Sequence, residues 1–463
     1  MWQIRKPKDQ IVPPEEVAER TEEQRRLITT GDAGAFAHND LHTDLKVELH
    51  QRLLGLINLS ALDTMSREQI QDEVGDIVLE ELDKQRHALN LAERRKLVDD
   101  VLDELLGLGP LEPLLKDATI TDILVNGHNS VFVERYGVLE ASPVRFKDEK
   151  HLIRIIQKIV SAVGRRVDES SPLCDARLAD GSRVNAVVPP LALDGALLSI
   201  RKFAKIPISM ERLIEIGSVP AQVAEVMQAI VKARLNVLIS GGTGSGKTTM
   251  LNAMSAFIDN RERIVTIEDS AELQLQQTHV ARLETRPANI EGRGEIIQRD
   301  LVKNSLRMRP DRIIVGEVRA GEAFDMLQAM NTGHDGSMTT VHANTPRDAL
   351  SRVEQMIGMS GIDVPARSAR AQIASAIHAV VQVARLSDGR RKLVSLSELS
   401  GMEGDVITMQ EIFRFRQTGV ATDGSVQGRF EATGIRPRFL EQVMAHGVTL
   451  SPDLFRPDRN FEA

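Results

Sequence analysis

The stretch that decides the fold is Asn236-Val237-Leu238-Ile239-Ser240-Gly241-Gly242-Thr243-Gly244-Ser245-Gly246-Lys247-Thr248. Its first five residues predict a buried strand, and its last eight match the phosphate-binding pattern G-x-x-x-x-G-K-[ST]. The glycines let the main chain approach a phosphate and adopt positive φ angles. A helix from Lys247 would then point its N-terminus at the phosphates. A chance glycine-rich turn would not sit between an apolar strand and an amphipathic helix.

Two side chains of this motif carry the chemistry. Lys247 supplies a mobile positive charge, and the Thr248 hydroxyl is a candidate Mg²⁺ ligand. ATP and Mg²⁺ are the expected cofactors. The expected nucleotide-binding residues are Gly241, Gly242, Thr243, Gly244, Ser245, Gly246, Lys247, Thr248 and Thr249.

The patterns around the motif predict several segments and an α/β fold class. Strands alternate with helices from residue 221 onward, which predicts a mostly parallel sheet covered on both faces. Upstream, strand and turn signals predict an α+β domain, preceded by helices with apolar residues at helical spacing. The expected order is a flexible segment 1–40, a helical bundle 41–107, an α+β domain 108–203, a linker 204–220 and a nucleotide-binding domain with a C-terminal subdomain 221–463.

Composition excludes several classes of protein. The net charge of −8 and an aromatic content of 3% disfavour a nucleic-acid binder, which would show a basic excess and stacking residues. Cys174 is the single cysteine, so an internal disulfide and a four-cysteine zinc site are excluded. We find no apolar run of membrane-spanning length and no apolar segment typical of a signal peptide. We therefore expect a cytoplasmic protein that meets membranes through partners.

Acidic residues follow two predicted strands. Glu268 comes after Thr266-Ile267, and Glu317 comes after Ile313-Ile314-Val315-Gly316. Because ligands bind at the carboxyl ends of parallel strands, both acids are candidates for holding Mg²⁺ or activating water. Gly316 stands where an Asp usually precedes the Glu, and Asp311 lies at the other end of its strand. We expect Glu317 to act on water and Glu268 to hold the water shell of the metal.

Two histidines, His334 and His342, lie in a polar segment after the strand that ends near Glu317. This is a usual place for a residue that senses the γ-phosphate, although a lone histidine is more often structural. From the residues alone, a sensor role and a structural role remain equally open.

The segment from Leu301 to Arg319, LVKNSLRMRPDRIIVGEVR, and the segment Thr332-Gly333-His334-Asp335-Gly336-Ser337 strongly resemble the ATPases of type II and type IV secretion and type IV pili. The resemblance covers roughly residues 107–400 and is closest to the CpaF/TadA branch, the assembly motors of the Tad pilus. Four motifs of that superfamily occur in order, and the missing Asp at position 316 is one of its traits. They are the phosphate loop, an Asp box (Glu268, Asp269, Glu272), a strand ending in Glu317, and a His box (His334, His342).

The resemblance implies a RecA-like ATPase domain, a PAS-like α+β domain before it, and a helical N-terminal extension. It also implies that arginines of the N-terminal domain reach the nucleotide, and Arg183 and Arg201 match that pattern. A surface ion pair is the alternative for each. Arg307 and Arg309 stand where a neighbouring subunit could use them. The expected catalytic residues are Glu317, Glu268, Lys247, Arg183, Arg201 and His342, and the expected metal ligands are Thr248, Glu268 and Glu317.

The function implied by the resemblance is a hexameric motor that hydrolyses ATP to assemble a Tad pilus. Its partners would be copies of itself, polytopic inner-membrane platform proteins and, indirectly, pilin subunits, with no nucleic acid. Two alternatives remain open. A RecA-like nucleic-acid translocase would bind DNA with a steep salt dependence. A nucleotide-gated scaffold of a secretion system would hardly turn ATP over.

Overall fold

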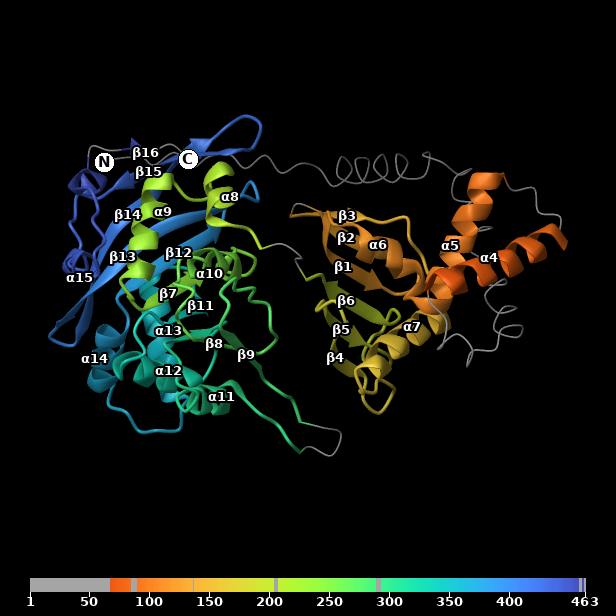
Figure 1. The fold of residues 1–463 in the computed structure, drawn as a ribbon, viewed down its shortest axis with the longest axis horizontal. Coiled ribbons are helices and arrows are strands. Elements are labelled where there is room, and N and C mark those ends of the chain that lie inside the picture. The colour runs from red at the N-terminus through yellow and green to blue at the C-terminus, as the bar shows by residue number, and fades with distance from the viewer. Residues whose placement is uncertain are drawn as a thin grey trace, which may run out of the picture. The chain divides into compact units, whose positions relative to one another are not determined.

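The computed structural model describes residues 67–84, 90–135, 137–203, 207–288, 293–457 and 460–461. The chain forms two compact units, Met1–Lys202 and Phe203–Ala463 (Figure 1). The expected segment 1–40, the first part of the expected helical bundle and residues 204–206 of the expected linker lie outside the described residues. Among the described helices, none combines the length and the apolar composition that crossing a membrane requires.

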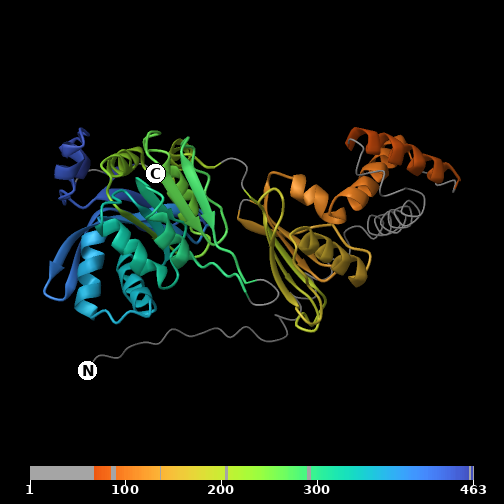
Figure 2. The same cartoon turned by 60° about the horizontal axis from the view of Figure 1, so that its bottom comes forward.

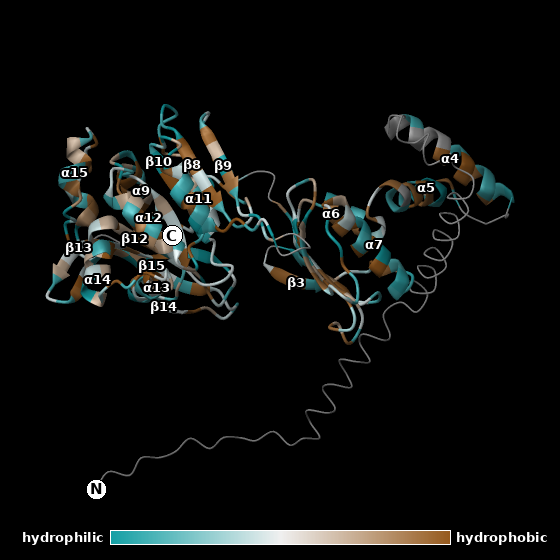
Figure 3. Cartoon of the chain, turned by 90° about the horizontal axis from the view of Figure 1, so that it is seen from below, coloured by the Kyte–Doolittle hydropathy of each residue, from teal (hydrophilic) through white to brown (hydrophobic). Residues whose placement is uncertain are grey.

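The first unit is built on an antiparallel sheet with the strand order β3-β2-β1-β6-β5-β4. Helix α7, Glu149–Ala162, packs its apolar side on one face of this sheet and carries hydrophilic residues on its other side (Figures 2 and 3). The alternate residues of the strands point to the opposite face and are exposed or half-buried. The strands are β1 Ile120–Asn126, β2 Val131–Arg135, β3 Val138–Ala141, β4 Leu173–Arg177, β5 Arg183–Val187 and β6 Leu197–Arg201.

Two helices precede this sheet, α4 (Arg67–Lys84) and α5 (Leu91–Leu106), and they pack against each other. A capping box begins α5. The Asn90 side chain accepts from the Glu93 N–H, and the Glu93 side chain accepts from the Asn90 N–H. The short helices η1 (Gly109–Leu111) and α6 (Glu112–Lys116) then lead into the sheet.

Polar contacts join α5 to α7. Buried Glu104 of α5 is hydrogen-bonded to buried His151 of α7. Lys158 Nζ, also on α7, donates to the carbonyl of Gly107 at 2.7 Å. The end of the expected bundle is therefore attached to the sheet domain by specific contacts, which its helical spacing did not reveal.

The second unit is a three-layer α/β structure, so the predicted fold class is confirmed. Its sheet has the strand order β16-β15-β14-β13-β12-β7-β11-β10-β8-β9. The strands from β12 to β9 in this order are parallel, and β13 to β16 extend the sheet in antiparallel fashion. The strands are β7 Val237–Gly241, β8 Ile264–Glu268, β9 Val280–Glu284, β10 Arg312–Val315, β11 Met338–His342, β12 Ala379–Arg385, β13 Arg391–Glu403, β14 Val406–Val420, β15 Val426–Ala432 and β16 Asn460–Phe461.

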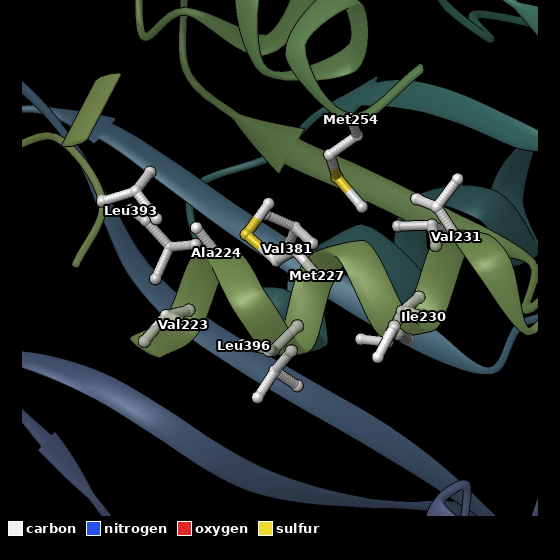
Figure 4. Close-up of a cluster of buried hydrophobic side chains, with 14 of the residues drawn as sticks. Val223, Ala224, Met227, Ile230, Val231, Met254, Val381, Leu393 and Leu396 are labelled. Atoms are coloured by element: carbon white, nitrogen blue, oxygen red, sulfur yellow. The ribbon is translucent and has the colours of Figure 1, made fainter. Parts of the chain in front are cut away.

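Helices cover this sheet on both sides. One core takes in Val237 and Ile239 of β7, and the other takes in Leu238, because successive side chains of a strand point to opposite faces. Figure 4 shows α9 side chains such as Met227 packed toward Val381 of the sheet. The helices are α8 Met210–Glu215, α9 Ala221–Lys232, α10 Lys247–Ser255, α11 Gln298–Ser305, α12 Glu322–Asn331, α13 Pro346–Gly358, α14 Ala366–Ala376, α15 Leu440–Ala445 and the 3₁₀ helix η2 Pro452–Phe455.

Candidate active site

The glycine-rich loop connects the buried strand β7 to helix α10. Gly244 and Gly246 have φ angles of 66° and 94°, a region that side chains with a Cβ rarely adopt. A Cβ on Gly241 would lie 2.6 Å from the carbonyl oxygen of Val383 on β12. The glycines are thus required by the backbone and by close packing. The loop leads directly to the N-terminus of α10, where amide groups favour an anion.

Lys247 is the first residue of α10 and folds back over the loop. Its Nζ donates to the carbonyl of Gly242 at 3.0 Å, and the Ser245 hydroxyl donates to the same carbonyl at 2.9 Å. Burial lowers the pKa of the Lys247 ammonium, and the nearby charge of Glu317 opposes that shift. A phosphate group would supply the negative charge that this half-buried ammonium needs.

Glu268 ends β8 and is 3% exposed. Its Oε2 accepts hydrogen bonds from the N–H groups of Glu272 and Leu273, at 2.7 and 2.8 Å. Its Oε1 is buried and has no hydrogen-bond partner within the described residues. Burial raises the pKa of this carboxyl, while the two backbone hydrogen bonds lower it. An oxygen of this kind suits a water molecule or a metal-bound water.

The packing of Glu268 explains the missing Asp before Glu317. A Cβ on Gly316 would lie 3.0 Å from Cγ of Glu268. The Gly316 N–H donates to the carbonyl of Ile267 on β8 at 2.8 Å, which holds the two strand ends together. A larger residue at position 316 would have to displace the side chain of Glu268.

Glu317 is tied to the Asp box by an arginine. Arg319 donates from Nη2 to Glu317 at 2.8 Å and from Nη1 to Asp269 at 3.1 Å. One guanidinium therefore bridges carboxylates that follow two neighbouring parallel strands, β10 and β8. Arg319 was not among the site residues predicted from the sequence, although it follows Glu317 by only two positions.

The structure separates the two histidines of the His box. His342 ends β11 beside Gly241, and its Nε2 lies 3.5 Å from the Thr243 hydroxyl in the phosphate loop. His334 precedes β11, and its Nδ1 lies 3.3 Å from the carbonyl oxygen of Ala329 at the end of α12. Because β11 and β7 are parallel, His334 lies at the amino edge of the sheet and only His342 lies at the loop.

Other predicted residues lie elsewhere. Arg307 and Arg309 precede β10 and are therefore at the amino edge of the parallel strands, away from the phosphate loop of their own subunit. Arg183 and Arg201 belong to the first unit, on neighbouring strands of its sheet. The phosphate loop with Lys247 lies at the carboxyl edge of the second unit's sheet, together with the predicted residues His342, Glu317 and Glu268.

Sequence reasoning missed one further residue at the loop. Arg391 begins β13, and its Nε donates to the carbonyl of Gly244 at 2.8 Å. It lies 144 positions from Lys247 in the sequence, and no motif marks it (391 − 247 = 144). Pairing of β12 with β7 places the β12–β13 hairpin beside the phosphate loop.

Comparison with known proteins gives the family. Residues 104–435 match the family described as Type II/IV secretion system protein. The chain belongs to this family. As a type II/IV secretion protein with an intact phosphate loop, it binds nucleotide and is an ATP hydrolase.

The match to relatives of this secretion protein covers most of the length of each relative. A Mycobacterium tuberculosis protein named for conjugal transfer is 42% identical over 309 residues, which are 65% of this chain and 87% of the relative. The conjugal transfer protein TrbB of Rhizobium radiobacter is 33% identical over 303 residues, 64% of this chain and 87% of the relative. The solved VirB11 ATPase of the Brucella suis type IV secretion system has 26% identity, covers 62% of this chain and 95% of its own, and gives a TM-score of 0.34.

Proposed function

We propose that this secretion ATPase is the motor of a Tad pilus, a hexamer that hydrolyses ATP to drive pilin extraction and pilus assembly. The support for the Tad branch is the resemblance of Leu301–Arg319 and of Thr332–Ser337 to its members. The single cysteine, Cys174, agrees with it, because the classical pilus-extension motors resembling this chain carry a four-cysteine zinc motif.

The proposed chemistry is attack of water on the γ-phosphate at one edge of the sheet. Lys247 and the loop amides would bind the phosphates, and Glu317 would accept hydrogen bonds from the attacking water. Mg²⁺, held by Thr248 with Glu268 and Glu317 nearby, would supply positive charge to the phosphates. His342 would sense the γ-phosphate through its contact with the Thr243 hydroxyl in the loop. Arg183 and Arg201 would neutralise charge that develops during phosphoryl transfer.

One observation carries the hydrolysis assignment. The neighbouring parallel strands β7, β11, β10 and β8 end at the same edge, and each ends in or leads directly to predicted site residues there. Such an edge is where ligands bind in open α/β sheets. Arg319 links two of these strand ends through Glu317 and Asp269, so these two carboxylates are held side by side.

The proposed setting is the cytoplasmic side of the inner membrane. Contact with the membrane would pass through polytopic platform proteins, and pilin subunits would be moved indirectly. A conjugal transfer machine is the second candidate, because several relatives above 30% identity are named for that process. The net charge of −8 favours a protein cargo over direct binding of DNA by this chain.

The first experiment measures Mg²⁺-dependent ATP hydrolysis by the purified chain. Lys247→Ala should lower turnover by about a hundredfold or more, because the phosphate charge is then left uncompensated. Lys232→Ala, at the exposed end of α9, is the matched control and should hydrolyse ATP normally. Undiminished hydrolysis by pure Lys247→Ala protein would refute the assignment of the phosphate loop.

A second experiment decides between the two machines. Cells that carry only the Lys247→Ala chain should lack surface pili while they still transfer plasmids. Loss of plasmid transfer with normal pili would favour the conjugation machine. Particle mass with an ATP analogue should correspond to six subunits, and a monomer under all nucleotide conditions would refute the ring.

A further inference from the structure

The hairpin between β12 and β13 places two arginines beside the phosphate loop. Arg385 ends β12 directly opposite Arg391, the first residue of β13. Arg391 Nε donates to the carbonyl of Gly244 at 2.8 Å, and its Cδ lies 3.6 Å from the position that a Cβ on Gly246 would take. The side chain of Arg391 therefore lies along the outside of the loop, on the side of β7 away from Glu317 and Glu268.

The main chain at the start of β13 makes a second set of contacts, to the residues that follow α8. The Ser218 hydroxyl donates to the carbonyl of Arg391 at 2.6 Å, and the Leu393 N–H donates to the carbonyl of Ser218 at 3.0 Å. Lys392 Nζ donates to the carbonyl of Gly217 at 2.7 Å. Residues 217–218 are thus hydrogen-bonded to three consecutive residues of β13.

This junction is well anchored. Lys392 is 5% exposed, and its ammonium lies over the rings of Phe415 and Phe430, with 5.2 and 5.5 Å to the centroids. The Ser218 N–H donates to the carbonyl of Leu213 at 2.8 Å, which closes α8. Helix α8 also packs against α10, the helix that begins at Lys247. A displacement at Gly217–Ser218 would therefore be resisted by the buried core.

We propose that Arg391 is a positioning residue for nucleotide binding, which holds the phosphate loop at Gly244 and connects it to Gly217–Ser218, the residues that follow α8. The proposal rests on nucleotide binding at this loop. Because a peptide group is planar, fixing the Gly244 carbonyl also fixes the direction of the Ser245 N–H, one of the amide donors of the loop. Binding of nucleotide in the loop would then stabilise the segment around Ser218, which follows α8.

The coupling between the phosphate loop and the segment after α8 must act in both directions. If nucleotide steadies the end of α8 through Arg391, then weakening the contact of Ser218 with β13 must weaken nucleotide binding by the same coupling. The Ser218 hydroxyl bonds the Arg391 carbonyl and is not part of the phosphate loop. An effect of Ser218→Ala on affinity would therefore reach the loop indirectly, through β13 or through the packing of α8 against α10.

The choice of arginine matters for the contact. The bond to Gly244 comes from Nε, which lies in the side chain before the guanidinium carbon, whereas the donor of a lysine sits at the tip of a flexible stem. Arg391→Lys keeps the positive charge but should lose this bond. The lysine variant therefore separates positioning of the loop from simple attraction between a cation and phosphate.

The test uses the full chain, with ADP as the probe. Calorimetry gives the affinity, steady-state kinetics with ATP give KM and kcat, and amide hydrogen exchange follows residues 210–219 with and without ADP.

We expect Arg391→Ala and Arg391→Lys to weaken ADP binding and raise KM by about tenfold, the scale of one charged hydrogen bond, with kcat changed by less than about twofold. Ser218→Ala should weaken ADP binding by about threefold. ADP should slow exchange at residues 210–219 in the wild type and not in these variants.

Arg416→Ala, an exposed arginine on β14, is the matched control and should behave as wild type. Wild-type affinity in Arg391→Ala, or full rescue by Arg391→Lys, would overturn the positioning role. Protection of residues 210–219 that persists in Arg391→Ala would overturn the connection to α8. If Arg391→Ala fails to fold, the Ser218→Ala protein provides the test. Wild-type affinity of Ser218→Ala for ADP would then overturn the proposal. Absence of ADP binding by the wild type would instead refute the nucleotide site itself.

Discussion

Arg183 of β5 lies directly opposite Arg201 of β6 on the exposed face of the first unit's sheet. The same row continues to Arg177 on one side and to Asp122 on the other. Like charges that face each other across strands destabilise a sheet. Arg201 Nε pairs with Asp122 at 3.1 Å, but its side chain is 63% exposed, so this pair contributes little. The role of Arg183 and Arg201 in phosphoryl transfer stays a prediction, which the variants below test.

We predict that Arg183→Ala and Arg201→Ala lower kcat by about a hundredfold or more while ATP affinity changes far less. The reason is that an arginine acting on the transferred phosphoryl group meets most of its charge in the transition state. Nucleotide titration beside steady-state kinetics checks this. Arg154→Ala, on the exposed side of α7, is the matched control. Equal losses in affinity and rate would indicate ordinary ground-state contacts.

The two acids should differ in what their removal does. Glu317→Gln should bind ATP normally and hydrolyse it at least about a hundredfold more slowly, because the charge that polarises water is gone while the shape remains. Glu268→Gln should also slow hydrolysis and should weaken the dependence on Mg²⁺ more than Glu317→Gln does. Single-turnover rates and Mg²⁺ titrations of both variants give the answer. If Glu317→Gln hydrolyses ATP at nearly the wild-type rate while Glu268→Gln is inactive, the two roles are reversed.

A half-buried histidine away from the phosphate loop should make stability depend on pH. His378 precedes β12, and its Nδ1 accepts a hydrogen bond from the Asn236 N–H at 3.1 Å, which requires a neutral ring nitrogen. Burial lowers the pKa of His378 from its ordinary value of 6.5, and Asp335 only partly opposes this. The unfolded chain therefore binds this proton more readily than the folded one, so stability is kept above pH 6.5 and is lost as pH falls.

The measurement compares urea unfolding of wild type and His378→Gln between pH 8 and pH 5.5. Below pH 6.5 the wild type should lose more unfolding free energy than the variant, whose side chain does not titrate. The exposed His446→Gln serves as the control and should follow the wild-type curve. Parallel losses in wild type and His378→Gln would show that this ring does not govern the pH dependence.

Truncation should show where the motor begins. Deleting residues 1–89 should leave hydrolysis largely intact, because the phosphate loop and both acids belong to the second unit. Deleting residues 1–107 should keep hydrolysis as well but should lower the melting temperature of the first unit. That deletion removes Glu104, the partner of buried His151, and the Gly107 carbonyl bonded by Lys158. Loss of ATPase activity in a folded 1–89 deletion would place the N-terminal segment within the motor.

The sequence alone was sufficient for the parts of the fold and site that depend on local pattern. A buried strand, a glycine-rich turn and a helix beginning at Lys247 are neighbours in the chain, so their residue types predict their geometry directly. The alternation of strands and helices predicted the three-layer α/β fold for a similar reason. Acids that follow parallel strands could be expected at one edge, and Glu317 and Glu268 do lie there.

Only the tertiary structure decided the relations between segments distant in the chain. Strand order and register place His342 at the loop and His334 at the opposite edge, although the two are eight residues apart (342 − 334 = 8). The need for a glycine at position 316 comes from the side chain of Glu268 on β8. The place of Arg391 beside the loop comes from the hairpin of β12 and β13. Sequence spacing fixes which face or end a residue occupies within its own element. Which elements become neighbours is set by packing of the whole sheet, and no local pattern records it.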